Sequence, residues 1–306
     1  GACLLVFIIS LLALERYSRG KARYQHTTVR YRSLNRLQLT KLKQLISFLF
    51  CLLPVSLGFI IPALVLLRWA FQTTKWWFNL DFLGFAFNSF ILAAIASLCA
   101  VGLAVAMAYG TRLSPNIYTR FGVRLASVGY AVPGSVLAVG IMLPFSALDN
   151  TIDAFFRSSF NLSTGLILSG TIVAVIFAYI VRFLSVSFNA VEAGLGKVTQ
   201  NMDNASRTLG ASSTETLKRV HLPLIRASML TAGILVFVDV IKELPETMIM
   251  RPFNFTTLAV RTFELASDEQ LAEASSAALA MVIVGIIPVI MISRTISKSR
   301  PGQQDN

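Results

Sequence analysis

Six long apolar blocks, five of which carry at most one charge, constrain the fold of this chain more than any other feature. They lie at about 45–67, 85–109, 125–147, 164–187, 229–250 and 272–293. A helix needs about 20 apolar residues to cross the roughly 30 Å of hydrocarbon in a bilayer. Each block reaches that length, and its apolar residues are continuous rather than confined to one helical face. We therefore predict an all-α, polytopic membrane protein with six complete spans.

Composition supports the same class, because 55% of the 306 residues are hydrophobic and only 14% are charged. A soluble domain of this size needs far more charge on its surface. A seventh apolar block, Ala2–Leu14, is cut short by the start of the sequence. No basic segment precedes it and no small-residue cleavage site follows it, so we expect the truncated last span of a preceding segment rather than a signal peptide.

The distribution of charge predicts the orientation of the spans. Alternate segments between the blocks hold 21 of the 27 Lys and Arg residues: 15–43, 110–124, 182–228 and the tail that begins at Arg294. Because cytoplasmic loops are enriched in Lys and Arg, we place these segments in the cytoplasm of a multi-pass bacterial inner-membrane protein. The predicted organisation is a truncated span at 1–14, a basic cytoplasmic linker at 15–44, a six-span domain at 45–293 and a cytoplasmic tail at 294–306.

The basic linker is expected to face anionic membrane lipid rather than nucleic acid. Its only aromatic residues are Tyr17, Tyr24 and Tyr31, too few for a surface on which bases stack. The three cysteines lie in apolar blocks without metal-type spacing, and the two histidines are far apart in sequence. These patterns favour neither a disulfide nor a zinc site.

The longest loop between the blocks, 188–228, is cytoplasmic and carries the most specific pattern. Helix-forming residues from Asp203 to Leu209 are followed by Gly210, which can adopt backbone conformations closed to other residues. Asp203 is placed to act as an N-cap or first-turn acid. A second short amphipathic helix is predicted after Ser213, ending at Pro223. The residues alone leave two interpretations open, a helix–turn–helix that docks a partner and a solvated connector.

Charged residues interrupt the fifth complete span. Asp239, Lys242, Glu243 and Glu246 lie in it, and Pro245 removes a backbone hydrogen bond and predicts a kink or opening. A charge near the bilayer centre costs at least about 2.5 kcal/mol on insertion scales. We expect Lys242 to pair with Asp239 (i, i+3) and with Glu246 (i, i+4). The cluster is either a structural set of ion pairs or the lining of a cation pathway.

The loop resembles the EAA loop of ABC-transporter permeases. Asn204-Ala205-Ser206, three residues, Gly210, nine residues and Val220-His221-Leu222-Pro223 reproduce the spacing of that family's pattern. Asn204 replaces the pattern's glutamate and Ser206 its second alanine, so a carboxylate that could pair with the partner is missing. The resemblance implies that this loop couples the spans to the ATP-binding subunit. The coupling residues so implied are Asp203, Asn204, Ala205, Ser206, Leu209, Gly210, Ala211, Val220, Leu222 and Pro223.

The segments 238–261 and 129–144 are similar to the ferric-iron branch of these permeases, and the resemblance covers nearly the whole chain. It implies a type I importer fold (MetI-like) and the second half of a fused two-half permease. The partners implied are the preceding permease half, two copies of an ATP-binding subunit that carries ATP and Mg, and a periplasmic ferric-iron-binding protein. The residues assigned to the translocation pathway or gate are Asp239, Lys242, Glu243, Pro245, Glu246 and Arg251.

Other cargoes and classes stay open at this stage. Asp239, Glu243 and Glu246 are candidate ligands for a hard trivalent cation, which prefers oxygen donors. Related permeases carry thiamine, polyamines or inorganic anions. A gradient-driven secondary transporter would use the acids as its ion site, but it has no need for a coupling loop. The chain contains no G-x-x-x-x-G-K-[ST], HExxH or G-x-S-x-G motif, so we expect a transport subunit without a bound cofactor rather than an enzyme.

Overall fold

The computed structural model describes residues 39–73, 80–126 and 128–298, and within them the chain is helical without a β-strand. The predicted all-α class is confirmed. The predicted truncated span at 1–14, most of the linker at 15–44 and the last residues of the tail lie outside the described residues. The helices are α2 (Lys41–Val55), η1 (Ser56–Ile60), α3 (Ile61–Gln72), α4 (Leu80–Leu113), α5 (Ile117–Ala126), η3 (Gly129–Ala131), α6 (Gly134–Phe160), α7 (Ile172–Leu195), α8 (Gln200–Thr208), α9 (Ser213–Thr216), η4 (Leu217–His221), α10 (Leu222–Ile241), α11 (Pro245–Met250), α12 (Leu258–Ser267) and α13 (Leu271–Lys298).

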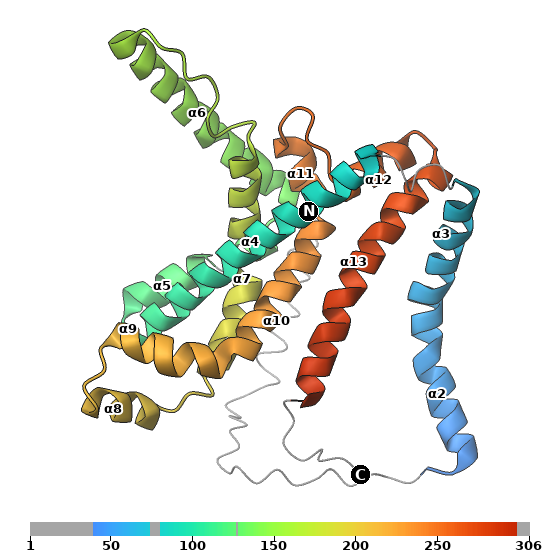
Figure 1. Cartoon of the computed structure of the whole chain (residues 1–306), viewed down its shortest axis with the longest axis horizontal. Helices are drawn as coiled ribbons and strands as arrows, with labels where there is room; N and C mark the ends of the chain where they lie inside the picture. Colours follow the sequence, from blue (N-terminus) through green and yellow to red (C-terminus); the bar gives the residue numbers. More distant parts are fainter. Residues whose placement is uncertain (1–38, 74–79, 127, 299–306) are drawn as a thin grey trace.

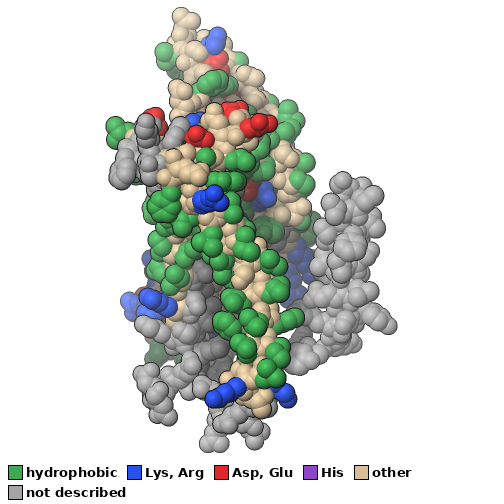
Figure 2. All heavy atoms as spheres, turned by 90° about the vertical axis from the view of Figure 1, so that its right-hand side faces the viewer, with side chains coloured by type: hydrophobic (Ala, Val, Ile, Leu, Met, Phe, Trp, Pro, Cys, Tyr) green, Lys and Arg blue, Asp and Glu red, His purple; other side chains and the backbone are tan. Residues whose placement is uncertain are grey.

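Five continuous helices in the described residues are long and apolar enough to span a membrane. They cover Lys41–Gln72, Leu80–Leu113, Gly134–Phe160, Ile172–Leu195 and Ser213–Ile241. The sixth predicted block lies in α13, whose apolar stretch runs over Leu271–Ile287. On the face shown in Figure 2, most acidic side chains lie toward the upper end, and hydrophobic side chains cover the stretch below them.

The core is formed by α4, α7 and α10, which pack against one another (Figure 1). On α4, the side chains of Ala93, Ala96, Ala100 and Ala104 have no exposed surface. Their spacing places these small residues on one helical face, where they let the neighbouring backbones approach closely, as in other membrane helix bundles. On the other side, α13 packs against both α10 and α3. Helix α2 has no buried residue and stands at the edge of the molecule.

Two predicted loops are shorter than expected because helical structure continues into them. α6 runs to Phe160, so most of the stretch 148–163 between the predicted blocks 125–147 and 164–187 is helix. Asp149, fully buried on α6, accepts backbone N–H bonds from Ile167, Leu168 and Ser169 at 3.1, 2.9 and 2.7 Å. These bonds hold the returning chain against α6.

The predicted loop 188–228 also begins later than expected. α7 extends to Leu195 because Phe188, Val191 and Leu195 keep the helical spacing of buried apolar residues. The polar residues Asn189 and Glu192 lie on the exposed side of the same helix. Between the predicted blocks 229–250 and 272–293, the structure contains α12, whose Thr257 N-cap hydroxyl accepts from Val260 N–H.

The prediction that Pro223 ends a helix is wrong. Residues from Ser213 to Ile241 form one continuous helix, and Pro223 lies in the first turn of α10. The π-turn η4 precedes it, and Leu222 N–H bonds the carbonyl of Leu217, five residues back. The wider turn accommodates a proline that has no N–H and would clash in a regular helix. The predicted break near Pro245 is confirmed, since α10 ends at Ile241 and α11 begins at Pro245.

Candidate functional site

The predicted helix–turn–helix of the EAA-like loop is present as α8, a glycine turn and α9. Gly210 has φ +83°, a conformation that other residues rarely adopt. The turn is closed by bonds from Gly210 N–H to Arg207 O (2.9 Å) and from Ala211 N–H to Ser206 O (3.1 Å). Ser212 and Glu215 form a capping box that starts α9. This α8–α9 segment, residues 200–221, is therefore a defined structure.

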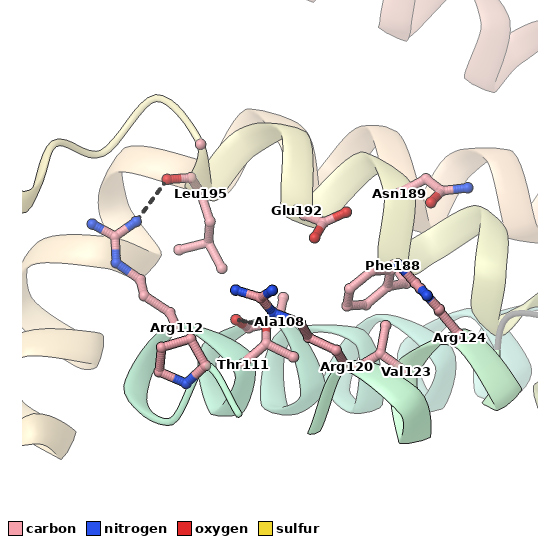
Figure 3. A pocket seen from close by; sticks show the side chains of 12 residues that line it. Ala108, Thr111, Arg112, Arg120, Val123, Arg124, Phe188, Asn189, Glu192 and Leu195 are labelled. Atoms are coloured by element: carbon pink, nitrogen blue, oxygen red, sulfur yellow. Dashed lines mark hydrogen bonds between the residues drawn. The ribbon is translucent and has the colours of Figure 1, made fainter. Parts of the chain in front are cut away.

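The segment is fastened to the end of α4 by Arg112. Its guanidinium donates to the carbonyls of Leu195 (2.9 Å) and Val198 (2.8 Å), and to Asp203 Oδ2 (2.9 Å). Figure 3 shows the bond to Leu195. Tyr109, one turn earlier on α4, donates its hydroxyl to Ser213 O at 2.6 Å. Movement of α8 and α9 is thereby linked to α4, one of the three core helices.

Asp203 lies at the centre of these contacts. It is the predicted first-turn acid of α8, and its second oxygen lies 2.6 Å from Nε2 of the buried His221. Burial opposes ionisation of Asp203, but the hydrogen bonds from His221 and Arg112 outweigh it and hold the pKa of this carboxyl below its usual value. Asp203 is therefore a carboxylate at neutral pH. Sequence reasoning missed His221, because an isolated histidine in a polar loop carries no signal without its partner.

Different residues of the segment face inward and outward. The side chain of Ser206 is buried, and its hydroxyl lies 2.8 Å from that of Thr216. The serine that replaces the pattern's second alanine thus joins α8 to α9. Leu209 is 87% exposed, and Asn204 and Ala205 are exposed beside it. The remaining predicted coupling residues follow the same division: Ala211, Val220 and Leu222 are half-buried, and Pro223 is exposed.

A second group of predicted site residues lies at the break between α10 and α11. Glu243 and Glu246 both bind Nη1 of Arg182, at 3.1 and 3.0 Å. Glu246 is completely buried, Glu243 is 8% exposed and the Arg182 side chain is 20% exposed. One guanidinium therefore faces two carboxylates, and Oε2 of Glu246 has no hydrogen-bond partner among the described residues. We call these three residues the Arg182 cluster.

Only part of the predicted pairing is observed. Lys242 binds Asp239 at 2.9 Å, as predicted, although its side chain is 67% exposed. The predicted pair between Lys242 and Glu246 does not form, because the helix ends at Ile241 and the i, i+4 geometry is lost. Glu246 forms its ion pair with Arg182 instead. The described residues contain no group of three or more acids, histidines or cysteines that could hold a metal, so Asp239, Glu243 and Glu246 do not assemble into the predicted ligand set.

Arg182 is the main functional candidate that sequence reasoning misplaced. It was counted with the cytoplasmic basic segment 182–228, but it lies in the middle of α7, Ile172–Leu195. A signal was available, because Arg182 is a single charge within a long apolar run and the next span carries an excess of acid. Arg251, predicted to belong to the pathway, binds Glu264 at 2.9 Å and Thr256 at 2.8 Å instead.

The two sequence segments that resemble the iron branch meet at the Arg182 cluster. A methyl group added to Gly134, at the start of α6, would overlap Nη1 of Arg182 and lie 3.1 Å from Oε1 of Glu243. One added to Gly129 would overlap the carbonyl oxygen of Val181. Next to the Arg182 cluster, a short hydrogen bond between the hydroxyl groups of Tyr179 and Thr247 joins α7 to α11. The chain thus encloses the cluster between α6, α7 and α11.

We predict that Gly129→Ala destabilises this region and lowers transport severalfold. The new methyl group overlaps backbone of α7 rather than a flexible side chain, so helix and loop must move apart next to Arg182. Such overpacking costs about 1–3 kcal/mol. Gly140→Ala in α6 is the matched control, because nothing lies within 4 Å of its added methyl group. Thermal unfolding of the purified variants measures the effect, and equal midpoints would contradict the prediction.

Comparisons with known proteins agree with this architecture. Residues 100–300 match the family of binding-protein-dependent transport system inner membrane components. The Fe(3+)-transport system permease protein FbpB 2 of Haemophilus influenzae is 26% identical over 301 residues, which cover 96% of this chain and 56% of that protein. The 2-aminoethylphosphonate transport system permease protein PhnV of Salmonella typhimurium is 28% identical over 70% of this chain and 73% of its own length.

A solved structure supports the fold independently. A chain of a bacterial alginate ABC transporter superposes with a TM-score of 0.64 at 12% identity, covering 82% of this chain and 92% of that chain. At this identity the likeness concerns the fold alone, and it confirms the expected permease architecture. The chain spans about half the length of FbpB 2.

Proposed function

Because the chain belongs to the family of binding-protein-dependent transport system inner membrane components, we propose that it is the permease of an ATP-driven ferric-iron importer. The α8–α9 segment carries this proposal. It has the spacing of the EAA pattern, an exposed Leu209 and a rigid connection through Arg112 to α4. In this assignment the segment and the C-terminus face the cytoplasm, as the distribution of Lys and Arg predicts.

The proposed mechanism is mechanical coupling. A separate ATP-binding subunit, which carries ATP and Mg, takes the exposed face of α8 into a cleft. The residues proposed to enter it are Asn204 and Ala205 of α8, with Leu209 and Gly210 of the turn that follows. Asn204 supplies an uncharged amide where the pattern has a carboxylate, so contact at this position is by hydrogen bonds and packing. When the subunits close, force passes through Asp203 and Arg112 to α4, and through the continuous helix from Ser213 to α10.

The Arg182 cluster is proposed as the gate of the translocation pathway. It lies where α10 is interrupted, and its two glutamates outnumber its arginine, which favours a cation over an anion. Asp239, Lys242 and Pro245 lie at the same interruption, whereas Arg251 follows α11 and binds Glu264. Since the acids are held by side-chain cations, we assign them to gating rather than to metal ligation.

Iron is favoured as cargo by the ferric relative, which matches 96% of the chain, whereas the aminoethylphosphonate relative matches 70%. We further propose that the chain is the second half of a longer permease, since it covers 56% of that ferric relative. The preceding half would complete the pathway, two ATP-binding subunits would drive it, and a periplasmic iron-binding protein would deliver the cargo.

The test is uptake by cells that express the full-length permease with its binding protein and ATPase. Ferric iron, 2-aminoethylphosphonate, thiamine and a polyamine are compared as labelled cargoes. We expect accumulation of iron alone, and its loss when the phosphate-loop lysine of the ATPase is replaced. Uptake of another cargo in place of iron would overturn the cargo assignment. Uptake that survives ATPase inactivation but stops when the proton gradient is dissipated would instead support a secondary transporter.

A further inference from the structure

A basic pocket lies beside the α8–α9 segment, at the end of α4. Its volume is about 740 Å³, and it is bounded by the last turn of α4, by α5 and by the last two turns of α7. Figure 3 shows Arg112, Arg120 and Arg124 along one side, with Asn189 and Glu192 of α7 across from them. Of the residues that line this pocket, the proposed coupling uses only Arg112, and the proposed gate uses none.

The charges in the pocket are not balanced by the protein. Arg112 is engaged by Asp203 and two carbonyls, but Arg120 and Arg124 form no ion pair or side-chain hydrogen bond with the described residues. These two arginines are four residues apart on α5, so they are neighbours that repel each other. Glu192 is the single acid among the lining residues. An anion placed between the arginines would relieve the repulsion.

Helix α5 has the features of a helix that lies in the membrane interface. Ile117, Tyr118, Phe121 and Leu125 share one side of α5 and are 73%, 82%, 65% and 64% exposed. Arg120 and Arg124 lie on the adjoining side of the helix, toward the pocket. A short helix with an exposed apolar side and a basic side buries the former at the acyl boundary and keeps the latter at headgroup level. Only three residues separate it from α4, a membrane span.

We propose that this pocket binds the phosphate headgroup of an anionic phospholipid. The apolar side of α5 would lie among the acyl chains of that lipid, and Arg120 and Arg124 would bind its phosphate. Arginine suits this role because its planar fork donates two hydrogen bonds to one phosphate. Basic pockets between membrane helices on the cytoplasmic side are recognised sites for such headgroups. Bound lipid would also pack near Arg112 and thereby stabilise the contact between Arg112 and Asp203 that holds the α8–α9 segment.

The test uses the full-length permease purified in a neutral detergent. Lipid binding is followed by native mass spectrometry and by thermal unfolding, with phosphatidylglycerol and phosphatidylcholine as probes. We expect saturable retention and stabilisation by phosphatidylglycerol alone. The double variant Arg120→Gln/Arg124→Gln should raise the half-saturating lipid concentration about tenfold or more. The matched control, Lys197→Gln/Arg226→Gln, removes two exposed charges outside the pocket. Because exposed charges are screened by salt, this variant should change the half-saturating lipid concentration by no more than about twofold.

A gain of affinity provides a test that does not depend on a weakened protein. Glu192→Gln removes the one acid from the lining and should lower the half-saturating concentration severalfold. If both double variants lost the same affinity for phosphatidylglycerol, binding would depend on overall positive charge, and the proposed site would be refuted. Displacement of the lipid by millimolar inorganic phosphate, or binding of phosphate without lipid, would overturn the lipid assignment in favour of a free anion.

Discussion

Arg182→Gln is expected to abolish transport and to lower the stability of the permease strongly. The substitution leaves Glu243 and Glu246 side by side, 8% and 0% exposed, without a cation between them. Breaking a buried ion pair by removing one partner costs about 3–5 kcal/mol, because the remaining charge stays buried without compensation. Uptake of the labelled cargo and thermal unfolding of the purified protein measure the two effects.

Two further variants separate the charge effect from the loss of a side chain. Arg182→Gln/Glu246→Gln removes one carboxylate along with the arginine, and we expect it to regain much of the lost stability. Lys242→Gln is the control on the same interruption. Lys242 is paired with Asp239, but its side chain is 67% exposed, so its removal should cost less than about 1 kcal/mol. Normal stability and uptake of Arg182→Gln would show that the cluster is neither a structural nor a gating element.

The double variant also distinguishes the proposed gate from a purely structural ion pair. If the Arg182 cluster only holds α7 to α11, restoring stability should restore uptake in proportion. If it forms a gate, the restored protein should remain deficient in uptake or lose its preference among cargoes. Recovery of both stability and selective uptake would therefore contradict the gate while leaving the fold and the family assignment intact.

The membrane spans and the α8–α9 segment could be predicted from the sequence because their signals are local. A continuous apolar run fixes a span, and the Gly210 turn follows from the conformational freedom of one residue. Reliance on local signals also explains why the predicted end of α7 is wrong. Asn189 and Glu192 interrupt the apolar run, yet they occupy the exposed side of a helix whose buried side continues to Leu195.

The parts that could not be predicted depend on contacts between distant segments. Arg182 meets Glu246 across 64 residues, and Arg112 meets Asp203 across 91. Counting charges by segment placed both arginines in cytoplasmic regions, although only Arg112 lies at a helix end. The alternation of charge still gave a consistent orientation, because one misplaced arginine among 27 basic residues does not reverse it.

Gly210→Val is expected to reduce uptake more than tenfold while leaving membrane insertion and protein level close to those of the parent. A Cβ atom added at Gly210 meets no atom within 4 Å, so we attribute the penalty to the backbone at φ +83° rather than to crowding. A β-branched residue held in this region costs about 1–3 kcal/mol, and the turn will relax to avoid that cost. Because α8 is fixed by Arg112 and α9 by Tyr109, the relaxation displaces the exposed turn between them.

Uncoupling is measured as the ratio of cargo transported to ATP hydrolysed by the reconstituted transporter. Gly165→Val is the matched control, since Gly165 also has positive φ (+63°) and open space around it but lies in the turn after α6. It should bear a similar backbone penalty without a change in the ratio. Gly210→Asn should retain more coupling than Gly210→Val, because asparagine tolerates the left-handed region better. A ratio for Gly210→Val equal to that of Gly165→Val would refute the assignment of the α8–α9 segment to coupling, whatever cargo the permease carries.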